Sequence, residues 1–238
     1  MKIGILGAMD QEVALLKDTL NNATEQQIAH LTFYSGTLNG IDIVLVKCGI
    51  GKVAAAVATT ILIHHFGPDY VVNTGSAGGF DTSLSIGDIV IGNGVQHHDV
   101  DITHFGYELG QAVGMPTVFE CDDTLVNAAE EAAAETLAVK TIRGLICTGD
   151  AFIGSDEAAA RLRESFPAIG ASEMEGAAIA QASYMLDTPF LVIRSLSDIA
   201  GKTSTVSFNT YLETAAKNSA ELVIAMTAVL AKRQVSGN

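Results

Sequence analysis

Three carboxylates lie close to apolar segments in the second half of the sequence. Glu173 and Glu175 precede a run of small residues, 176–183, that is predicted to be a helix, and Asp198 follows the apolar run 190–193. A carboxylate near buried surface must be hydrogen-bonded, paired or protonated. Carboxylates at the ends of elements therefore indicate a site that binds hydroxyl groups and moves a proton.

Further residues upstream have side chains or backbone suited to such a site. Glu12 lies in the first turn of a predicted helix, where the helix dipole favours an anion, so it is either an ordinary helix charge or a general base. The glycine-rich segment 73–79 lets a ligand or another backbone approach closely. It matches neither a dinucleotide-binding motif nor a P-loop. Phe152 either stacks on a flat ring or belongs to the core.

A group of histidines and aspartates occupies the segment 97–104. Its density is typical of metal ligands, but His97 and His98 are adjacent, and Asp99 and Asp101 alternate as in an extended loop. No second cluster supplies further ligands at a recognisable spacing. We therefore predict that the protein uses neither a metal nor another cofactor.

Alternating strands and helices must position these residues. The predicted strands are 2–7, 31–38, 41–47, 69–73, 88–91, 141–147, 168–172 and 190–194. The predicted helices are 11–20, 52–66, 122–137, 155–165, 176–183 and 208–230. The pair Asn39-Gly40 predicts a hairpin, and 97–117 a long functional loop. This order predicts a mixed, mostly parallel sheet with helices on both faces, which binds ligands beyond the carboxyl ends of its strands.

Composition limits the classes of protein that this chain can represent. With 238 residues and 48% hydrophobic content it can bury one large core, and no shift in composition marks a linker, so 1–238 is predicted to be a single domain. Its net charge of −14 argues against partners such as nucleic acid or an anionic membrane. The three cysteines are widely spaced, and the apolar start of the chain is too short for a signal peptide, so we expect a cytoplasmic protein.

The motifs together resemble the nucleoside phosphorylase/nucleosidase superfamily over nearly the whole chain. They are 7–9 with Glu12, 49–54, 73–79, 87–90, 105–108, 149–153, 173–175 and 197–198. The glycine motifs are typical of the whole superfamily, whereas Glu12, the Phe-Ile pair 152–153 and the Glu-Met-Glu segment 173–175 resemble its nucleosidase branch. The resemblance implies a three-layer α/β/α sandwich with a central mixed, partly barrel-like sheet.

The resemblance also implies an activity. A member of this branch would hydrolyse the N-glycosidic bond of 5′-methylthioadenosine and S-adenosylhomocysteine, and of 5′-deoxyadenosine, to adenine and the corresponding sugar, in methionine salvage. The family is homodimeric, and water is its nucleophile. A phosphate-dependent purine nucleoside phosphorylase, an aminodeoxyfutalosine hydrolase and a nucleoside-binding protein without catalysis stay open as alternatives.

The same resemblance implies catalytic roles for particular residues of this sequence. Asp198 would be the general acid that protonates adenine N7, and Ser197 would orient it. Glu12 would position and deprotonate the water, helped by Ser76 and Arg194. An aspartate has an ordinary pKa near 3.9, so the pKa of Asp198 must be raised if it is to act as an acid at neutral pH.

The substrate-binding residues implied by the resemblance surround the sugar, the base and the 5′ substituent. Those of the ribose are Glu173, Met174 and Glu175. Those of the base are Phe152, which would stack on the ring, and Ile153, whose backbone would pair with its edge. Those of the sugar and 5′-thio region are Met9, Ile50 and Phe208, and Gly78 completes the set within one chain. Those that would reach the 5′ pocket of a partner subunit are Ile102, Phe105 and Tyr107.

The residue types favour hydrolysis on independent grounds. Breaking a C–N glycosidic bond builds positive charge on the ribose, and carboxylates beside the sugar stabilise that charge. The same carboxylates would repel the phosphate dianion that a phosphorylase must hold, and Arg194 is the one obvious cation among the predicted site residues.

Overall fold

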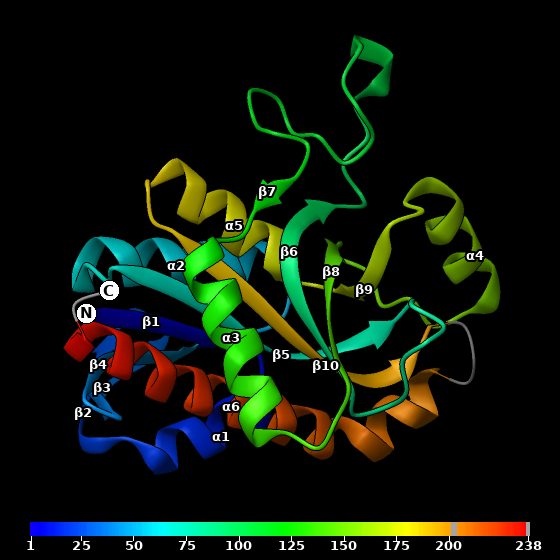
Figure 1. The fold of residues 1–238 in the computed structure, drawn as a ribbon. Coiled ribbons are helices and arrows are strands. Elements are labelled where there is room, and N and C mark those ends of the chain that lie inside the picture. The colour runs from blue at the N-terminus through cyan, green and yellow to red at the C-terminus, as the bar shows by residue number, and fades with distance from the viewer. Residues whose placement is uncertain (201–203, 237–238) are drawn as a thin grey trace.

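The computed structural model describes residues 1–200 and 204–236, in which a ten-stranded sheet forms the centre of the molecule (Figure 1). Its strands are β1 (Lys2–Gly7), β2 (Asn21–Ile28), β3 (Leu31–Leu38), β4 (Ile41–Lys47), β5 (Tyr70–Gly79), β6 (Ile89–His97), β7 (Phe119–Glu120), β8 (Thr141–Thr148), β9 (Ile169–Glu173) and β10 (Phe190–Ile199). Its order is β10-β6-β8-β9-β5-β1-β4-β3-β2, and β7 pairs with β6.

One end of the sheet closes on itself. Strand β10 pairs with β6 on one side and with β5 on the other, so β5, β10, β6, β8 and β9 form a closed ring of five strands. Strands β1, β4, β3 and β2 continue the sheet outward from β5. Parallel and antiparallel pairs both occur, which confirms the predicted mixed, partly barrel-like sheet.

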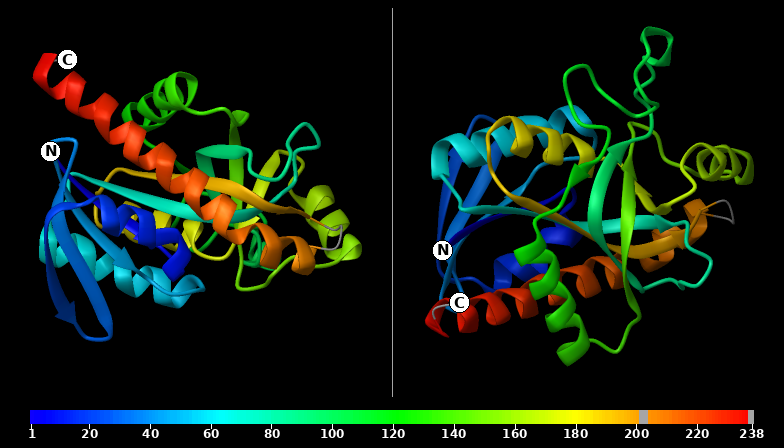
Figure 2. Two further views of the ribbon diagram at one scale, coloured as in Figure 1. Left: turned by 90° about the horizontal axis from the view of Figure 1, so that it is seen from below. Right: turned by 45° about the horizontal axis from the view of Figure 1, so that its top comes forward.

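Helices cover both sides of this sheet. They are α1 (Asp10–Thr19), α2 (Lys52–Phe66), α3 (Asp123–Thr136), α4 (Asp156–Ser165), α5 (Gly176–Met185) and α6 (Ser204–Ser236), with a short 3-10 turn η1 (Thr103–Phe105). Helix α2 packs on α5, whereas α6 packs on α1 and α3 from the opposite side (Figure 2). Strand β10 is covered from both sides, and nine of its ten residues are buried, although Arg194, Ser195, Ser197 and Asp198 are polar or charged. In the described residues no helix is long and apolar enough to cross a membrane.

The predicted elements are present, and the differences concern the lengths of several strands and of α6 and two strands that were not predicted. The glycine segment after Asn73 continues β5 to Gly79 instead of forming a turn, and β10 runs to Ile199, so Asp198 lies inside a strand. Helix α6 extends beyond the predicted 208–230 at both ends, and β6 runs to His97. The composition of 200–204 predicts a flap before the last helix, and this segment falls largely on 201–203, outside the described residues.

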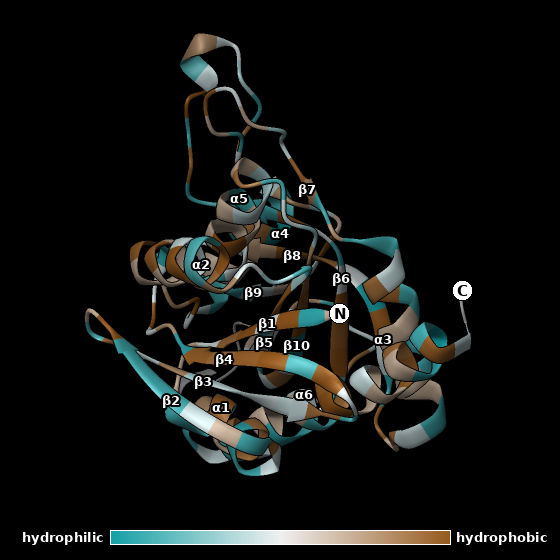
Figure 3. Cartoon of the chain, turned by 90° about the vertical axis from the view of Figure 1, so that its left-hand side faces the viewer, coloured by the Kyte–Doolittle hydropathy of each residue, from teal (hydrophilic) through white to brown (hydrophobic). Residues whose placement is uncertain are grey.

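Strand β2 was not predicted because its sequence lacks the usual signal. Its residues Asn21–Ile28 are almost all exposed, and most are polar, as the teal parts of β2 in Figure 3 show, so no apolar alternation marks it as a strand. It is held at the sheet edge by antiparallel pairing with β3.

Candidate active site

A cavity opens where β1, β4, β5, β8, β9 and β10 end, the edge at which the strand order predicted ligand binding. It encloses ≈ 470 Å³ of space outside the atoms, its open mouth included. Its lining residues are Ala8, Met9, Glu12, Ile50, Ser76, Ala77, Gly78, Phe152, Ser172, Glu173, Met174, Glu175, Ser197, Asp198 and Phe208. Most of this wall is apolar, and acidic groups supply all of its charge.

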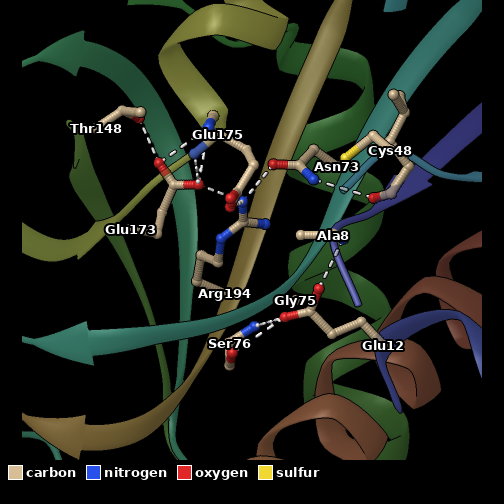
Figure 4. A network of polar contacts seen from close by, with 12 residues as sticks. Ala8, Glu12, Cys48, Asn73, Gly75, Ser76, Thr148, Glu173, Glu175 and Arg194 are labelled. Atoms are coloured by element: carbon tan, nitrogen blue, oxygen red, sulfur yellow. Dashed lines mark hydrogen bonds and ion pairs between the residues drawn. The ribbon is translucent and has the colours of Figure 1, made fainter. Parts of the chain in front are cut away.

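Glu12 is held by four hydrogen bonds at the start of α1. The amides of Ala8 and Met9 donate to its Oε2 at 2.8 and 3.1 Å, and the amide and hydroxyl of Ser76 donate to its Oε1 at 2.9 and 3.0 Å (Figure 4). The side chain is buried, and it bridges the end of β1 to β5. Donors on both oxygens fix the orientation of the carboxylate.

The carboxylate of Glu173 forms hydrogen bonds and an ion pair within the protein. It accepts hydrogen bonds from the amides of Glu175 and Gly176 at the start of α5, and from the hydroxyl of Thr148. It also pairs with Arg194 (Figure 4). A carboxylate at a helix N-terminus is stabilised by the amides there and by the helix dipole. Glu173 therefore fixes the turn that carries Glu175.

Arg194 lies beside the acidic side chains but does not line the cavity. Its guanidinium bonds the carboxylate of Glu173 and the side-chain oxygen of Asn73, and it lies 3.9 Å from Glu175. Burial opposes its charge, but the nearby glutamates outweigh that effect and raise the pKa of Arg194. No hydrogen bond described here joins Arg194 to Glu12, so the help to Glu12 that the sequence predicted is electrostatic at most.

The pKa of Glu175 is subject to opposing effects. Its Oε1 accepts the amide of Gly51 at 2.8 Å, at the N-terminus of α2. Burial, with the charge of Glu173 added to it, raises the pKa of Glu175 to about 8, and Arg194 and the Gly51 amide oppose that rise. The carboxyl of Glu175 therefore holds its proton more tightly than an ordinary glutamate does.

Asp198 lies on the far end of β10, 1% exposed. The hydroxyl of Ser197 donates to its Oδ1 at 3.0 Å. Gly78 of β5 makes room for it, because a Cβ at that position would lie 3.2 Å from Oδ2. Phe152 and Phe208 also line the cavity, and their rings meet edge to face with centroids 5.8 Å apart.

Twelve of the residues that the sequence singled out share this cavity. They are Met9, Glu12, Ile50, Ser76, Gly78, Phe152, Glu173, Met174, Glu175, Ser197, Asp198 and Phe208. Small lining residues were missed, namely Ala8, Ala77 and Ser172, because side chains of this size carry no chemical signal in a sequence.

The remaining predicted residues lie elsewhere in this chain. Ile153 packs against the apolar cluster formed around Phe166. Ile102, Phe105 and Tyr107 belong to the loop between β6 and β7, which extends away from the rest of the chain at the top of Figure 1. Phe105 is 76% exposed, so this loop leaves an aromatic side chain without intramolecular cover.

His97 and His98 of the segment 97–104 pack against neighbouring parts of the fold. Nε2 of His97 lies 2.9 Å from the side-chain oxygen of Gln181 on α5, and His98 packs against Gly149. Burial lowers the pKa of both imidazoles, which favours their neutral form. Within 1–200 and 204–236 no three His, Cys, Asp or Glu residues are arranged to hold a metal ion.

A match to a protein-family model defines the class of this protein. The model described as the phosphorylase superfamily matches residues 2–230. A protein of Psychromonas ingrahamii named 5′-methylthioadenosine/S-adenosylhomocysteine nucleosidase is 56% identical over 223 residues, which cover 94% of this chain and 96% of that protein. This chain thus belongs to the 5′-methylthioadenosine/S-adenosylhomocysteine nucleosidase family.

Solved structures agree with this assignment. A nucleosidase of that description from Colwellia psychrerythraea, in complex with adenine, is 55% identical with a TM-score of 0.95, covering 97% of this chain and 96% of its own. One from Neisseria meningitidis, in complex with methylthio-immucillin-A, is 44% identical with a TM-score of 0.94, covering 95% of this chain and 98% of its own.

Proposed function

We propose that this protein hydrolyses the N-glycosidic bond of 5′-methylthioadenosine and S-adenosylhomocysteine, and also of 5′-deoxyadenosine, releasing adenine. The observation that carries the proposal is that Glu12, Glu175 and Asp198 line one cavity. That set supplies a carboxylate for water, one for the sugar and an acid for the base. The relatives bound to adenine and to methylthio-immucillin-A support it.

The carboxyl of Glu175 binds the ribose hydroxyls in this proposal. Its second oxygen can accept from them while Gly51 occupies the first. As the glycosidic bond stretches, positive charge grows on the ribose ring, and the carboxyl oxygens of Glu175 beside it stabilise that charge. Met9, Met174 and Ile50 supply apolar surface for the sugar and its 5′-thio group.

Asp198 acts as the general acid. Its carboxyl gives a proton to N7 of adenine as the bond between C1′ and N9 breaks, and the electron pair of that bond passes to the base. The hydroxyl of Ser197 donates to Oδ1 and orients the carboxyl, and Oδ2 lies on the side of Gly78. Phe152 packs on the ring of the base.

Glu12 acts on the water. The water oxygen bonds to C1′ as its proton moves to the Glu12 carboxylate, which gives the free sugar hydroxyl. Ser76 and the amides of Ala8 and Met9 keep this carboxylate oriented. Both carboxyls return to their starting protonation by exchange with solvent after the products leave.

Hydrolysis is favoured over phosphorolysis by the charges around the cavity. A phosphate dianion requires cationic side chains or amides. Among the described lining residues none is cationic, and the guanidinium of Arg194 is committed to Glu173 and Asn73. The carboxylate of Glu12, which lines the cavity, would repel the dianion.

We also propose a homodimer in which the loop of Ile102, Phe105 and Tyr107 reaches the cavity of the partner subunit. Support comes from an apolar surface on α2 and α5, where Val57 and Met185 are more than half exposed. A second copy of this chain is the occupant, because the surface adjoins that loop at Val100. Sedimentation should give a dimer that Val57→Glu dissociates and Val235→Glu, at the exposed end of α6, leaves intact. A wild-type monomer would contradict the proposal.

The three cysteines are free and buried, which fits our proposal of a cytoplasmic protein. Residues 1–238 are proposed to act as one domain.

The test of the activity is adenine release from 5′-methylthioadenosine in phosphate-free buffer, repeated with phosphate. We expect fast release that phosphate leaves unchanged. Asp198→Asn should lower kcat by about 10²–10⁴-fold, whereas Asp156→Asn on the exposed start of α4 should not. Release that requires phosphate would identify a phosphorylase. Release only from aminodeoxyfutalosine would reassign the substrate.

A further inference from the structure

Two buried hydroxyls, one on β5 and one on α6, lie next to the segment that holds Glu12. Thr74 and Ser219 are 1% and 0% exposed, and their hydroxyls form a hydrogen bond in which either oxygen can donate. The Oγ of Ser219 also accepts the amide of Gly75 at 3.1 Å. A side chain from the middle of α6 therefore holds the backbone of β5 at Gly75.

That backbone position determines where the carboxylate of Glu12 lies. A Cβ on Gly75 would fall 2.6 Å from Oε1 of Glu12, so the carboxylate packs directly on the backbone there (Figure 4). The next residue, Ser76, donates both its amide and its hydroxyl to the same oxygen. A shift of residues 75–76 would move or release Oε1.

Ser219 takes the place of a missing strand partner. Strand β5 pairs with β1 only as far as Asn73, whereas β10 continues beside it to Gly79. The Gly75 amide, beyond the end of the β1 pairing, is buried and needs an acceptor. The hydroxyl of Ser219 supplies the acceptor that a neighbouring strand would otherwise offer.

The same turn of α6 is anchored at a second point of the closed ring. Nδ2 of Asn218 donates to the carbonyl of Gly87 at 2.9 Å, and the Gly87 amide donates to the carbonyl of Leu196 on β10 at 2.8 Å. Because α6 also packs on α1, which carries Glu12, the hydroxyl of Ser219 has a fixed place relative to the cavity.

We propose that Ser219, with Thr74, is a positioning residue for Glu12, which sets the rate of the chemical step rather than the affinity for substrate. This inference rests on the proposed function, in which Glu12 acts on water. The hydroxyl pair touches neither the cavity nor the substrate and acts through Gly75 and Ser76.

The test compares kcat and KM for 5′-methylthioadenosine among four variants. Ser219→Ala should lower kcat about 10- to 100-fold, the cost of a misplaced catalytic group, with KM within about threefold of wild type. Thr74→Val should lower kcat in the same direction by less, and Thr74→Ser, which keeps the hydroxyl, should restore it. If Ser219→Ala does not fold, the two Thr74 variants carry the test.

The matched control is Thr227→Val. Thr227 is a fully buried hydroxyl on the same helix, bonded to Asn39 far from the cavity. It should lower the melting temperature as Ser219→Ala does while leaving kcat unchanged. Equal losses of kcat in both variants, or a Ser219→Ala enzyme with wild-type kcat, would overturn the inference.

Failure of the proposed function is distinguishable from failure of this inference. Wild-type protein that releases no adenine would remove the function. Crystal structures of wild type and Ser219→Ala would then decide the inference alone: a displaced Glu12 carboxylate without its Ser76 hydrogen bonds supports it, and an unmoved one refutes it.

Discussion

Arg194 and Glu173 form an ion pair in which each side chain is 2% exposed. Removing both charges from water is costly, and the pair is tolerated because the amides at the start of α5 and the side chain of Asn73 add hydrogen bonds to it. The guanidinium of Arg194 therefore offsets the charge of Glu173 without lining the cavity, and the acidic side chains remain part of the cavity lining.

Removing one partner of this ion pair should lower the free energy of unfolding. Arg194→Met leaves Glu173 buried without its cation, so we expect a loss of about 3–5 kcal/mol in the free energy of unfolding. Urea denaturation followed by circular dichroism measures it. Arg161→Ala removes an exposed partner of Glu157 and should cost about 0.5 kcal/mol or less. Similar losses for the two variants would show that the buried pair has no special role.

The chemistry of the site was visible in the sequence because carboxylates beside apolar or small residues are rare without a function. Glu173, Glu175 and Asp198 were found in that way, whereas Glu12 stood out only by its place in the first turn of a helix. The strand-helix alternation indicated that these residues share one edge of the sheet. Ring closure was implied by the resemblance alone, since the pairing of β10 with both β5 and β6 joins strands far apart in the chain.

What the sequence could not give is the set of partners that hold the carboxylates. Ser219 reaches Gly75 across 144 positions, and Arg194 reaches Asn73 across 121. A serine in a long apolar helix resembles any other helix serine until the fold brings β5 beside it. The length of β5 was equally hidden, because the glycines that let Glu12 and Asp198 approach have the composition of a turn.

The raised pKa of Glu175 should make stability fall as pH rises. Its pKa is about 8 in the folded protein against an ordinary 4.5, so between these values the folded state keeps a proton that the unfolded chain has lost. The contribution of Glu175 is therefore fully present below pH 4.5 and is lost by pH 8, with a slope of up to about 1.4 kcal/mol per pH unit.

Glu175→Gln removes this slope because the amide does not titrate. Relative to wild type, the variant should gain stability as urea denaturation is repeated at pH 5, 6.5, 8 and 9. Glu157→Gln, at an 81% exposed side chain, is the control and should follow wild type. Parallel curves for Glu175→Gln and wild type would rule out a titration of Glu175 in this range.

The three thiols should be inert while the protein is folded. Burial raises the pKa of Cys121 and Cys147 to about 12 and raises that of Cys48 as well, so the reactive thiolate is scarce at pH 8. We expect negligible reaction with a disulfide reagent in native buffer and three equivalents after denaturation in urea. Rapid native labelling of any one cysteine would contradict this expectation.

Gly75→Ala tests how closely the carboxylate of Glu12 depends on the bare backbone of β5. The backbone of Gly75 has a φ of +159°, which residues other than glycine rarely adopt, and the added Cβ would lie 2.6 Å from Oε1 and 2.8 Å from Cδ of Glu12. The carboxylate must move and loses its bonds to Ser76, so kcat for adenine release should fall about 100-fold. Gly170→Ala on β9 is the matched control, because the nearest atoms to its Cβ are at 3.5 Å, an ordinary contact. Full activity in Gly75→Ala would mean that the position of Glu12 on this backbone does not limit the reaction.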